Sequence, residues 1–135
     1  MYSFETQIRV RYGETDQMGY LYYGNYAQYY EVGRVETMRS LGTSYKQMED
    51  AGILMPVIEL KSNYYKPAFY DDLLIVKTII PHLPGIRVVF QYEIFNENND
   101  LLNKGETTLV FIDKSRQKPV APPPYITEAL KTYFK

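Results

Sequence analysis

Residues 15–42 read TDQMGYLYYGNYAQYYEVGRVETMRSLG, and this stretch decides the fold. From Asn25 onward, aromatic and apolar residues recur at spacings of three and four, which is the period of one face of a helix. The members of this stripe are Tyr26, Tyr29, Tyr30, Gly33, Thr37 and Leu41. The pattern predicts a helix of about four to five turns that begins at Asn25 and ends at Gly42.

Three further features of this segment bear on the predicted helix: its cap, an interior glycine and a charged pair. Asn25 is a suitable N-cap residue, and Gln28 three positions later completes a capping-box pair. Gly33 is unfavourable in a helix interior by roughly 1 kcal/mol, so we expect it to let the backbone approach a sheet closely. Glu31 and Arg34 have the spacing of an ion pair on one helix face.

The segments around this helix have the patterns of strands. Residues 4–12 alternate between apolar and polar side chains, which predicts a half-buried strand. We expect further strands at residues 55–66, 73–80, 87–95 and 101–112, with residues 73–80 central, and short helices at 44–51 and near 126–134. Strands joined by tight turns are antiparallel. The sequence therefore predicts an α+β architecture in a single domain spanning residues 1–135.

Composition excludes several classes of protein. Fifteen Lys and Arg residues balance 16 Asp and Glu residues, and the formal net charge of −1 gives no electrostatic reason to expect nucleic acid as a partner. Cysteine is absent, and His82 is the single histidine, so neither a thiolate nor a poly-His metal site can form. No signal peptide and no apolar run of membrane-spanning length is visible. We expect a cytoplasmic protein without membrane insertion, metal or cofactor.

The chain is rich in tyrosine, with 15 tyrosines and no tryptophan. A tyrosine ring packs like other aromatic side chains, while its hydroxyl needs a polar partner at the edge of the core. Two interpretations follow from the composition: the rings fill the core and interfaces, or they line a ligand groove.

Asp16 is the carboxylate best placed for chemistry. Its loop leads to the start of the long helix, where free N–H groups stabilise developing negative charge. A carboxylate upstream of such donors provides half of a site made of a base or nucleophile and an oxyanion hole. An ordinary turn aspartate explains the same spacing. Because the chain lacks a phosphate-binding glycine motif and a G-x-S-x-G elbow, carboxylates, tyrosines and backbone amides must carry any reaction.

The segment at residues 9–42, RVRYGETDQMGYLYYGNYAQYYEVGRVETMRSLG, resembles the signature of hotdog-fold acyl-CoA thioesterases. It is most similar to the 4-hydroxybenzoyl-CoA thioesterase type, with the Tol-Pal-associated bacterial thioesterases. The matching elements are T-D-x-x-G at residues 15–19, the aromatic pair Tyr22-Tyr23, Asn25-Tyr26, and E-x-x-R at residues 31–34. A second match is YYKPAFYDDLLIV at residues 64–76.

The resemblance implies a hotdog fold, in which an antiparallel sheet of five to six strands wraps around one long central helix. It also implies hydrolysis of an acyl-CoA thioester to a free acid and CoA. By this resemblance, Asp16 attacks the thioester carbonyl or activates water, and the backbone N–H of Tyr23 polarises that carbonyl. The substrate-binding residues are expected to be Gly19, Tyr22, Asn25, Tyr26 and Lys66. Protomers of such enzymes pair sheet edge to sheet edge as homodimers or homotetramers, with the active site at the dimer interface.

The sequence departs from this pattern at Tyr23, where many relatives of the Tol-Pal type carry histidine. A phenol cannot replace an imidazole as a base near neutral pH, whereas the backbone N–H is present in either case. The alternative function is a non-catalytic module on the same fold that binds acyl-CoA or an acyl carrier protein. It predicts ligand affinity without release of a thiol.

Overall fold

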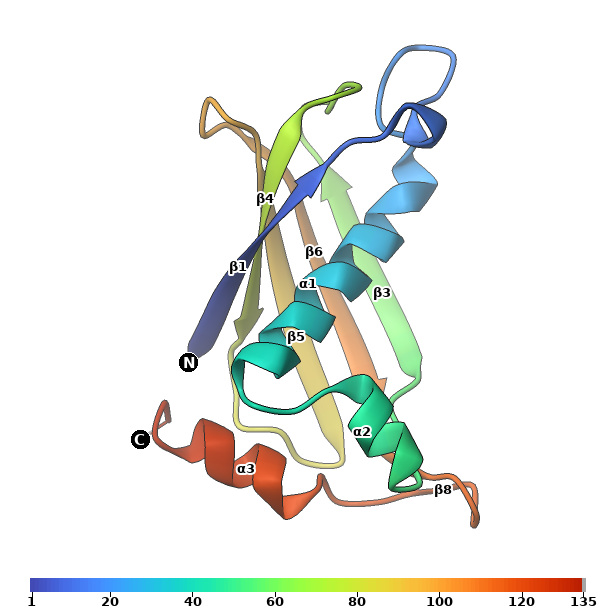
Figure 1. Ribbon diagram of the computed structural model, residues 1–135, viewed down its shortest axis with the longest axis vertical. Coiled ribbons are helices and arrows are strands. Elements are labelled where there is room, and N and C mark those ends of the chain that lie inside the picture. Colours follow the sequence, from blue (N-terminus) through green and yellow to red (C-terminus); the bar gives the residue numbers. More distant parts are fainter. Residues whose placement is uncertain (135) are drawn as a thin grey trace.

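In the computed structural model, which describes residues 1–134, one long helix lies against a curved antiparallel sheet (Figure 1). The sheet has the strand order β1-β4-β5-β6-β3. Its strands are β1 (Tyr2–Arg9), β3 (Val57–Tyr64), β4 (Leu73–Ile80), β5 (Arg87–Phe95) and β6 (Leu101–Val110). A separate three-stranded sheet contains β2 (Ile53–Leu54), β7 (Ile112–Asp113) and β8 (Lys118–Pro119). The helices are α1 (Tyr26–Ser40), α2 (Tyr45–Asp50) and α3 (Pro124–Lys131), and two 3-10 turns, η1 (Tyr12–Glu14) and η2 (Tyr23–Asn25), precede α1.

The predicted architecture is confirmed. Every strand pair of the large sheet is antiparallel, and the sheet has five strands. β5 lies in the middle of the order, and β4, predicted to be central, lies between β1 and β5. Alternate residues of β5 are buried, as their spacing predicted: Val88, Phe90, Tyr92 and Ile94. None of the described helices is long and apolar enough to cross a membrane.

The aromatic stripe of α1 forms the contact with the sheet. Tyr26, Tyr29 and Tyr30 are buried, as are Gly33 and Thr37. A Cβ atom on Gly33 would lie 2.5 Å from Oγ1 of Thr78 and 2.9 Å from Cγ1 of Val76, both on β4. The predicted reason for a glycine in the helix interior is therefore correct, because any side chain there would collide with the sheet.

Some element boundaries differ from the sequence-based expectation. β1 ends at Arg9 instead of continuing to Tyr12, because the backbone of Val10 bonds to residues 71 and 72 and the chain then turns through η1. The predicted strand at 101–112 divides into β6 and β7, with Phe111 between them donating its N–H to Ile86. α3 contains Ile126 and Leu130 as its buried residues and ends before residues 133 and 134.

Two predictions about α1 are wrong. Asn25 does not cap the helix with its side chain, because η2 runs directly into α1 and Asn25 already has helical dihedral angles (φ −81°, ψ −14°). Its Nδ2 instead donates to the carbonyl oxygen of Glu14 at 2.9 Å. Arg34, expected to pair with Glu31, is buried and donates from Nε to the Tyr45 hydroxyl at 3.0 Å, which ties α1 to α2.

Candidate active site

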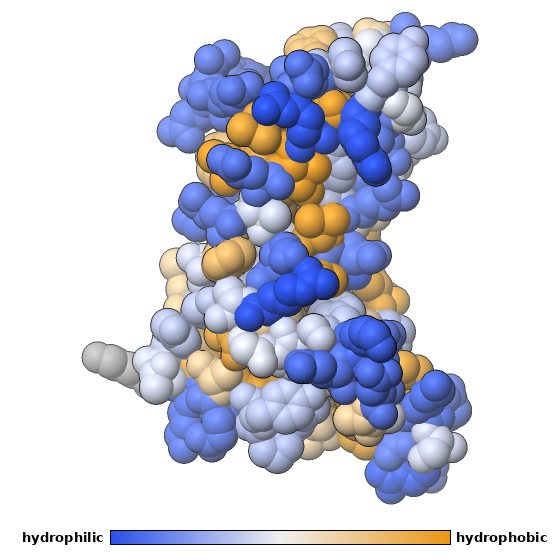
Figure 2. Space-filling model, in the orientation of Figure 1, coloured by the Kyte–Doolittle hydropathy of each residue, from blue (hydrophilic) through white to orange (hydrophobic). Residues whose placement is uncertain are grey.

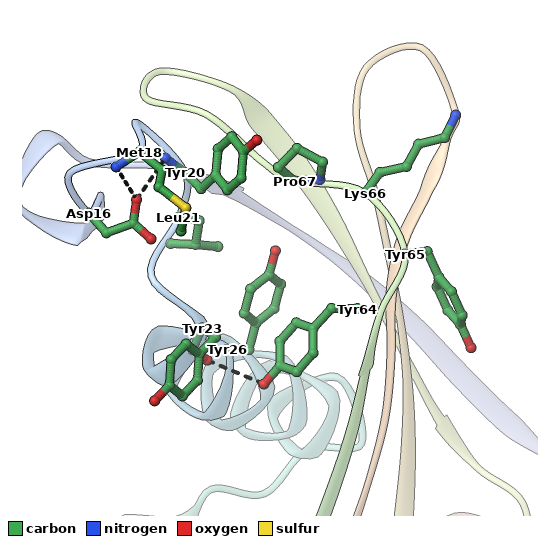
Figure 3. A pocket seen from close by; sticks show the side chains of 10 residues that line it. All are labelled: Asp16, Met18, Tyr20, Leu21, Tyr23, Tyr26, Tyr64, Tyr65, Lys66 and Pro67. Carbon is green, nitrogen blue, oxygen red and sulfur yellow. Dashed lines mark hydrogen bonds between the residues drawn. The ribbon is translucent and has the colours of Figure 1, made fainter.

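A cavity of about 270 Å³ opens where the loop before α1 meets the segment that follows β3 (Figure 3). Four of the predicted site residues line it: Asp16, Tyr23, Tyr26 and Lys66. The remaining lining residues are Met18, Tyr20, Leu21, Tyr64, Tyr65 and Pro67. The cavity thus combines one carboxylate, one lysine and several aromatic rings that come from two separate parts of the chain, residues 16–26 and 64–67.

The loop that carries Asp16 is a tight hairpin. The N–H of Asp16 donates to the carbonyl of Tyr20 at 2.8 Å, and Gly19 at the tip has a positive φ of 81°, which glycine adopts without strain. Oδ1 of Asp16 accepts the N–H groups of Met18 at 2.9 Å and Tyr20 at 3.2 Å. Oδ2 accepts no hydrogen bond from the residues that the structure describes. Asp16 is therefore both a turn aspartate and a carboxylate with one oxygen available at the cavity.

Tyr23 stands at the start of η2, just before α1. Within residues 1–134, the backbone N–H groups of Tyr23 and Gly24 have no hydrogen-bond acceptor. Unpaired N–H groups at the start of a helix attract negative charge. The ring of Tyr23 is 64% exposed and packs against Tyr22, with the ring centroids 4.7 Å apart.

Two tyrosines form a wall of the cavity. Tyr26 is buried, and its ring meets the ring of Tyr64 edge to face at 5.2 Å. The hydroxyl of Tyr64 donates to the carbonyl oxygen of Tyr23 at 3.5 Å, a long contact (Figure 3). Burial raises the pKa of Tyr26 to about 12, so its phenol stays neutral near pH 7. This wall is apolar along the rings and offers neutral hydroxyls at their edges.

Lys66 lies at the rim of the cavity, where its side chain is 59% exposed. Its Nζ is 3.6 Å from Oδ1 of Asp100 in the turn between β5 and β6. Exposed ion pairs of this kind contribute at most about 1 kcal/mol. The ammonium group can therefore exchange Asp100 for an anionic ligand at little cost.

Three predicted site residues do not line the cavity. Gly19 forms the tip of the hairpin, and Tyr22 is 44% exposed beside it. The carboxamide of Asn25 bonds to Glu14, as described above. These residues shape the loop around the cavity rather than its wall.

Several residues at the site were not among the predicted ones. Tyr64 and Tyr65 line the cavity from the end of β3, and the signal that could have identified them is the YYKPAFYDD motif, which they open. Glu14 does not line the cavity, but it too was not predicted to take part in the site. It stands two positions before Asp16 and is buried, which sequence pattern alone does not show for a glutamate.

The carboxylate of Glu14 has three donors. Oε1 accepts the N–H of Arg11 at 2.9 Å and the hydroxyl of Tyr29 at 2.8 Å, and Oε2 accepts Nη2 of Arg11 at 3.2 Å. Burial by itself raises the pKa of a carboxyl, but these hydrogen bonds and the charge of Arg11 outweigh it and hold the pKa of Glu14 below its ordinary value. Glu14 is therefore ionised at neutral pH although it is buried.

Known proteins share sequence and fold with this chain. The model of the family described as "Thioesterase superfamily" matches residues 18–103. The putative acyl-CoA thioesterase YneP of Bacillus subtilis is 38% identical over 120 residues, which are 89% of this chain and 87% of that protein. The acyl-CoA thioester hydrolase YbgC of Escherichia coli O157:H7 is 34% identical over 128 residues, 95% of this chain and 96% of that protein.

A solved structure agrees closely in fold. The DHNA-CoA thioesterase of Staphylococcus aureus superposes with a TM-score of 0.93 at 40% sequence identity, and the match covers 98% of this chain and 91% of that one.

The fold and these similarities define a hotdog-fold enzyme that hydrolyses thioesters, as predicted from the sequence. The chain belongs to the thioesterase superfamily, because the family model matches more than half of it and relatives above 30% identity extend over nearly all of it.

Proposed function

We propose that the protein hydrolyses acyl-CoA thioesters and that Asp16 is the catalytic carboxylate. The observation that carries this proposal is the shared cavity: Asp16, with Oδ2 available, and Tyr23, with an unpaired backbone N–H, line the same tyrosine-walled space. The relatives named for acyl-CoA support the substrate class.

In the proposed reaction, the carboxylate of Asp16 attacks the thioester carbonyl or removes a proton from an attacking water. The carbonyl oxygen becomes an oxyanion that accepts the N–H of Tyr23. The carbon–sulfur bond then breaks, and CoA leaves as a thiolate that takes up a proton. In the water route, the acyl group is released directly as a carboxylic acid. In the nucleophilic route, it remains on Asp16 as a mixed anhydride, and a water molecule hydrolyses this bond to release the acid and regenerate the carboxylate, so one water molecule is consumed by either route.

The available groups suffice for this chemistry. A single oxyanion donor lowers an activation barrier by roughly 3–4 kcal/mol, and a positioned base accelerates a reaction by about 10²- to 10⁴-fold. The thiolate of CoA is a good leaving group, so little acid catalysis is needed. The phenol of Tyr26 stays protonated near pH 7, because burial raises its pKa to about 12, and it can donate a hydrogen bond to the substrate.

We assign Lys66 to the CoA portion of the substrate. Its ammonium group lies at the rim of the cavity, and its exposed pair with Asp100 is weak. A phosphate of CoA would compete with this carboxylate. The roles of Gly19, Tyr22 and Asn25 are to hold the hairpin and the start of α1 beside the bound thioester.

Within this proposal, an aromatic acyl group is the favoured substrate. The acyl side of the cavity is lined by the rings of Tyr20, Tyr23, Tyr26 and Tyr64, which offer faces and edges for stacking. The Staphylococcus aureus relative is named for DHNA-CoA. An aliphatic chain would contact the same rings without this stacking contribution.

The decisive experiment measures release of free thiol from a panel of short, long and aromatic acyl-CoAs. Asp16→Asn keeps an oxygen that can accept the N–H groups of residues 18 and 20, so we expect the fold to persist and kcat to fall at least about 100-fold. Aromatic substrates should give the highest kcat/KM.

The matched control is Asp113→Asn. Oδ1 of Asp113 accepts the N–H groups of Ser115 at 3.0 Å and Arg116 at 3.1 Å, the same kind of turn as at Asp16, but Asp113 lies in β7. This variant should retain full activity. If Asp16→Asn is as fast as wild type, the assignment of Asp16 is wrong, and if the chain binds acyl-CoA but releases no thiol from any substrate, it is a binding module.

We also propose that two protomers join along β3, completing the site across the interface. β3 is an edge strand of the sheet, and four of its apolar side chains are exposed: Val57, Ile58, Leu60 and Tyr64. α1 packs against β1, β4 and β5, which leaves much of β3 uncovered (Figure 1). Figure 2 shows apolar side chains at several places on this face of the molecule. A long edge strand with exposed apolar side chains favours pairing with a second chain.

A further inference from the structure

We propose that Glu14 is a positioning residue, which fixes the hairpin of Asp16 relative to the start of α1. This inference rests on the proposed role of Asp16, and Glu14 itself does not line the cavity. Glu14 is 8% exposed and has hydrogen-bond partners on both sides of the hairpin and on the helix.

The backbone of Glu14 closes the base of the hairpin. Its carbonyl oxygen accepts two donors, the N–H of Tyr22 at 2.9 Å and Nδ2 of Asn25 at 2.9 Å. Above this base, Thr15 forms a bridge to Leu21 and the N–H of Asp16 donates to Tyr20. A shift of Glu14 would therefore move Asp16, which is only two rungs away.

The side chain of Glu14 connects this hairpin to the body of α1. Oε1 accepts the hydroxyl of Tyr29, a residue whose ring is buried in the first turn of the helix. The same oxygen accepts the N–H of Arg11, which lies just before η1. One carboxylate thus joins the segment before the hairpin and the helix after it.

This arrangement matters because the two proposed catalytic groups lie on the two segments that Glu14 joins. Asp16 lies within the hairpin, and Tyr23 offers its N–H at the start of η2, which runs into α1. Attack on a carbonyl needs the carboxylate over one face of the reacting carbon while the oxyanion donor points at the carbonyl oxygen. A misplacement of about 1 Å can slow a reaction about 100-fold.

The charge on Glu14 suits this role. Burying an unpaired carboxylate is strongly unfavourable, so Arg11 and the Tyr29 hydroxyl are required partners rather than optional ones. The titratable groups that face the carboxylate are Arg11 from the segment before η1 and Tyr29 from α1. A fully paired buried carboxylate of this kind holds its neighbours in one arrangement.

The test uses the full chain and separates positioning from simple stability. Glu14→Ala removes all three hydrogen bonds that the carboxylate accepts, and Tyr29→Phe removes only the one donated from the helix. We expect kcat to fall about 10- to 100-fold in Glu14→Ala, while KM changes by less than about threefold because the cavity wall is unaltered. Tyr29→Phe should lower kcat by a smaller factor, and it serves as the test if Glu14→Ala does not fold.

Tyr92→Phe is the matched control. It also deletes a buried tyrosine hydroxyl, which bonds to Oγ1 of Thr107 at 2.6 Å, but Tyr92 lies on β5 and does not contact the hairpin. We expect a comparable loss of stability with kcat unchanged. Equal losses of kcat in Tyr92→Phe and Tyr29→Phe would overturn the inference, as would full kcat in folded Glu14→Ala.

A second readout does not depend on catalysis. Hydrogen exchange at the N–H groups of Met18, Tyr20 and Tyr22 reports whether the hairpin is closed, since all three donate hydrogen bonds within it. Exchange should be faster in Glu14→Ala and Tyr29→Phe and unchanged in Tyr92→Phe.

If Asp16→Asn is fully active, the proposed catalytic role of Asp16 is wrong, whatever the Glu14 variants show. If Asp16→Asn is inactive and the Glu14 variants keep wild-type kcat and exchange, only the positioning role fails.

Discussion

The surroundings of the Glu14 side chain differ strongly from water. It is buried, yet its hydrogen bonds to Arg11 and Tyr29 keep the pKa of its carboxyl below the ordinary value. A group whose pKa is lowered on folding stabilises the folded state above its unfolded pKa, about 4.3 for glutamate. That stabilisation is lost as the pH falls through the lowered value.

We therefore expect the difference in unfolding free energy between wild type and Glu14→Gln to depend on pH. At pH 7 the variant should be less stable by roughly 1–3 kcal/mol, because the charged acceptor of Arg11 is lost. At about pH 3, which is below the unfolded pKa of about 4.3, the difference should shrink, because protonation of the Glu14 carboxyl then favours the unfolded wild-type chain. Urea unfolding of wild type and Glu14→Gln at both pH values measures this difference in unfolding free energy. Glu128→Gln is the control, because Glu128 is exposed on α3, and its unfolding free energy should be almost that of wild type at either pH. If the loss of unfolding free energy in Glu14→Gln is the same at both pH values, the expectation is wrong.

The element on which the site depends is α1, because it supports Tyr26 and Tyr29 against the sheet while its start offers free N–H groups. The closeness of helix and sheet depends on Gly33. Its missing side chain leaves room for Thr78 and Val76, which are β-branched and adjust little.

Gly33→Ala should lower the free energy of unfolding by about 1–2 kcal/mol. Overpacking costs about 1–3 kcal/mol, and the better helix propensity of alanine returns up to about 1 kcal/mol. Thermal or urea unfolding of wild type and Gly33→Ala measures this difference in the free energy of unfolding. Gly85→Ala is the control, since nothing lies within 4 Å of a Cβ atom there and φ is not positive. A Gly33→Ala protein as stable as wild type would mean that helix and sheet can move apart without loss.

At the scale of the whole molecule, the exposed edge of the sheet at β3 is the surface that we expect a second protomer to cover. Leu60 lies on β3 with the same facing as Ser62 and Tyr64, by strand alternation. Ser62 bonds to Tyr30 and Tyr64 contacts Tyr26, so this is the face toward α1. Leu60 nevertheless stays 45% exposed.

Leu60→Lys should therefore shift the protein from dimer to monomer in analytical ultracentrifugation and lower kcat/KM, because the charge would be buried at the proposed interface. Leu83→Lys is the matched control: Leu83 is 41% exposed in the loop between β4 and β5, away from the edge strand, and should leave both measurements unchanged. If Leu60→Lys remains a dimer, the interface between protomers does not lie along β3.

The sequence alone was sufficient for the main helix, the five long strands and the α+β architecture, but not for the strand order or the small second sheet. The spacing of tyrosines in residues 26–37 identified the buried face of α1, and alternation in residues 87–95 identified that of β5, since both depend only on local periodicity. Asp16 and Tyr26 were predicted as site residues from the motif at residues 15–26, which is contiguous in the chain, and both line the cavity.

The tertiary structure decided what distant segments do to each other. Asn25 fits the sequence rule for a helix cap, but the carbonyl of Glu14 lies within reach of its carboxamide, and no local pattern encodes that contact. Tyr64 reaches the cavity from β3, more than 40 residues from the hairpin, because of the curvature of the sheet. Burial of Glu14 is likewise a property of the packed chain, since a glutamate becomes stable inside only where folding brings it several donors at once.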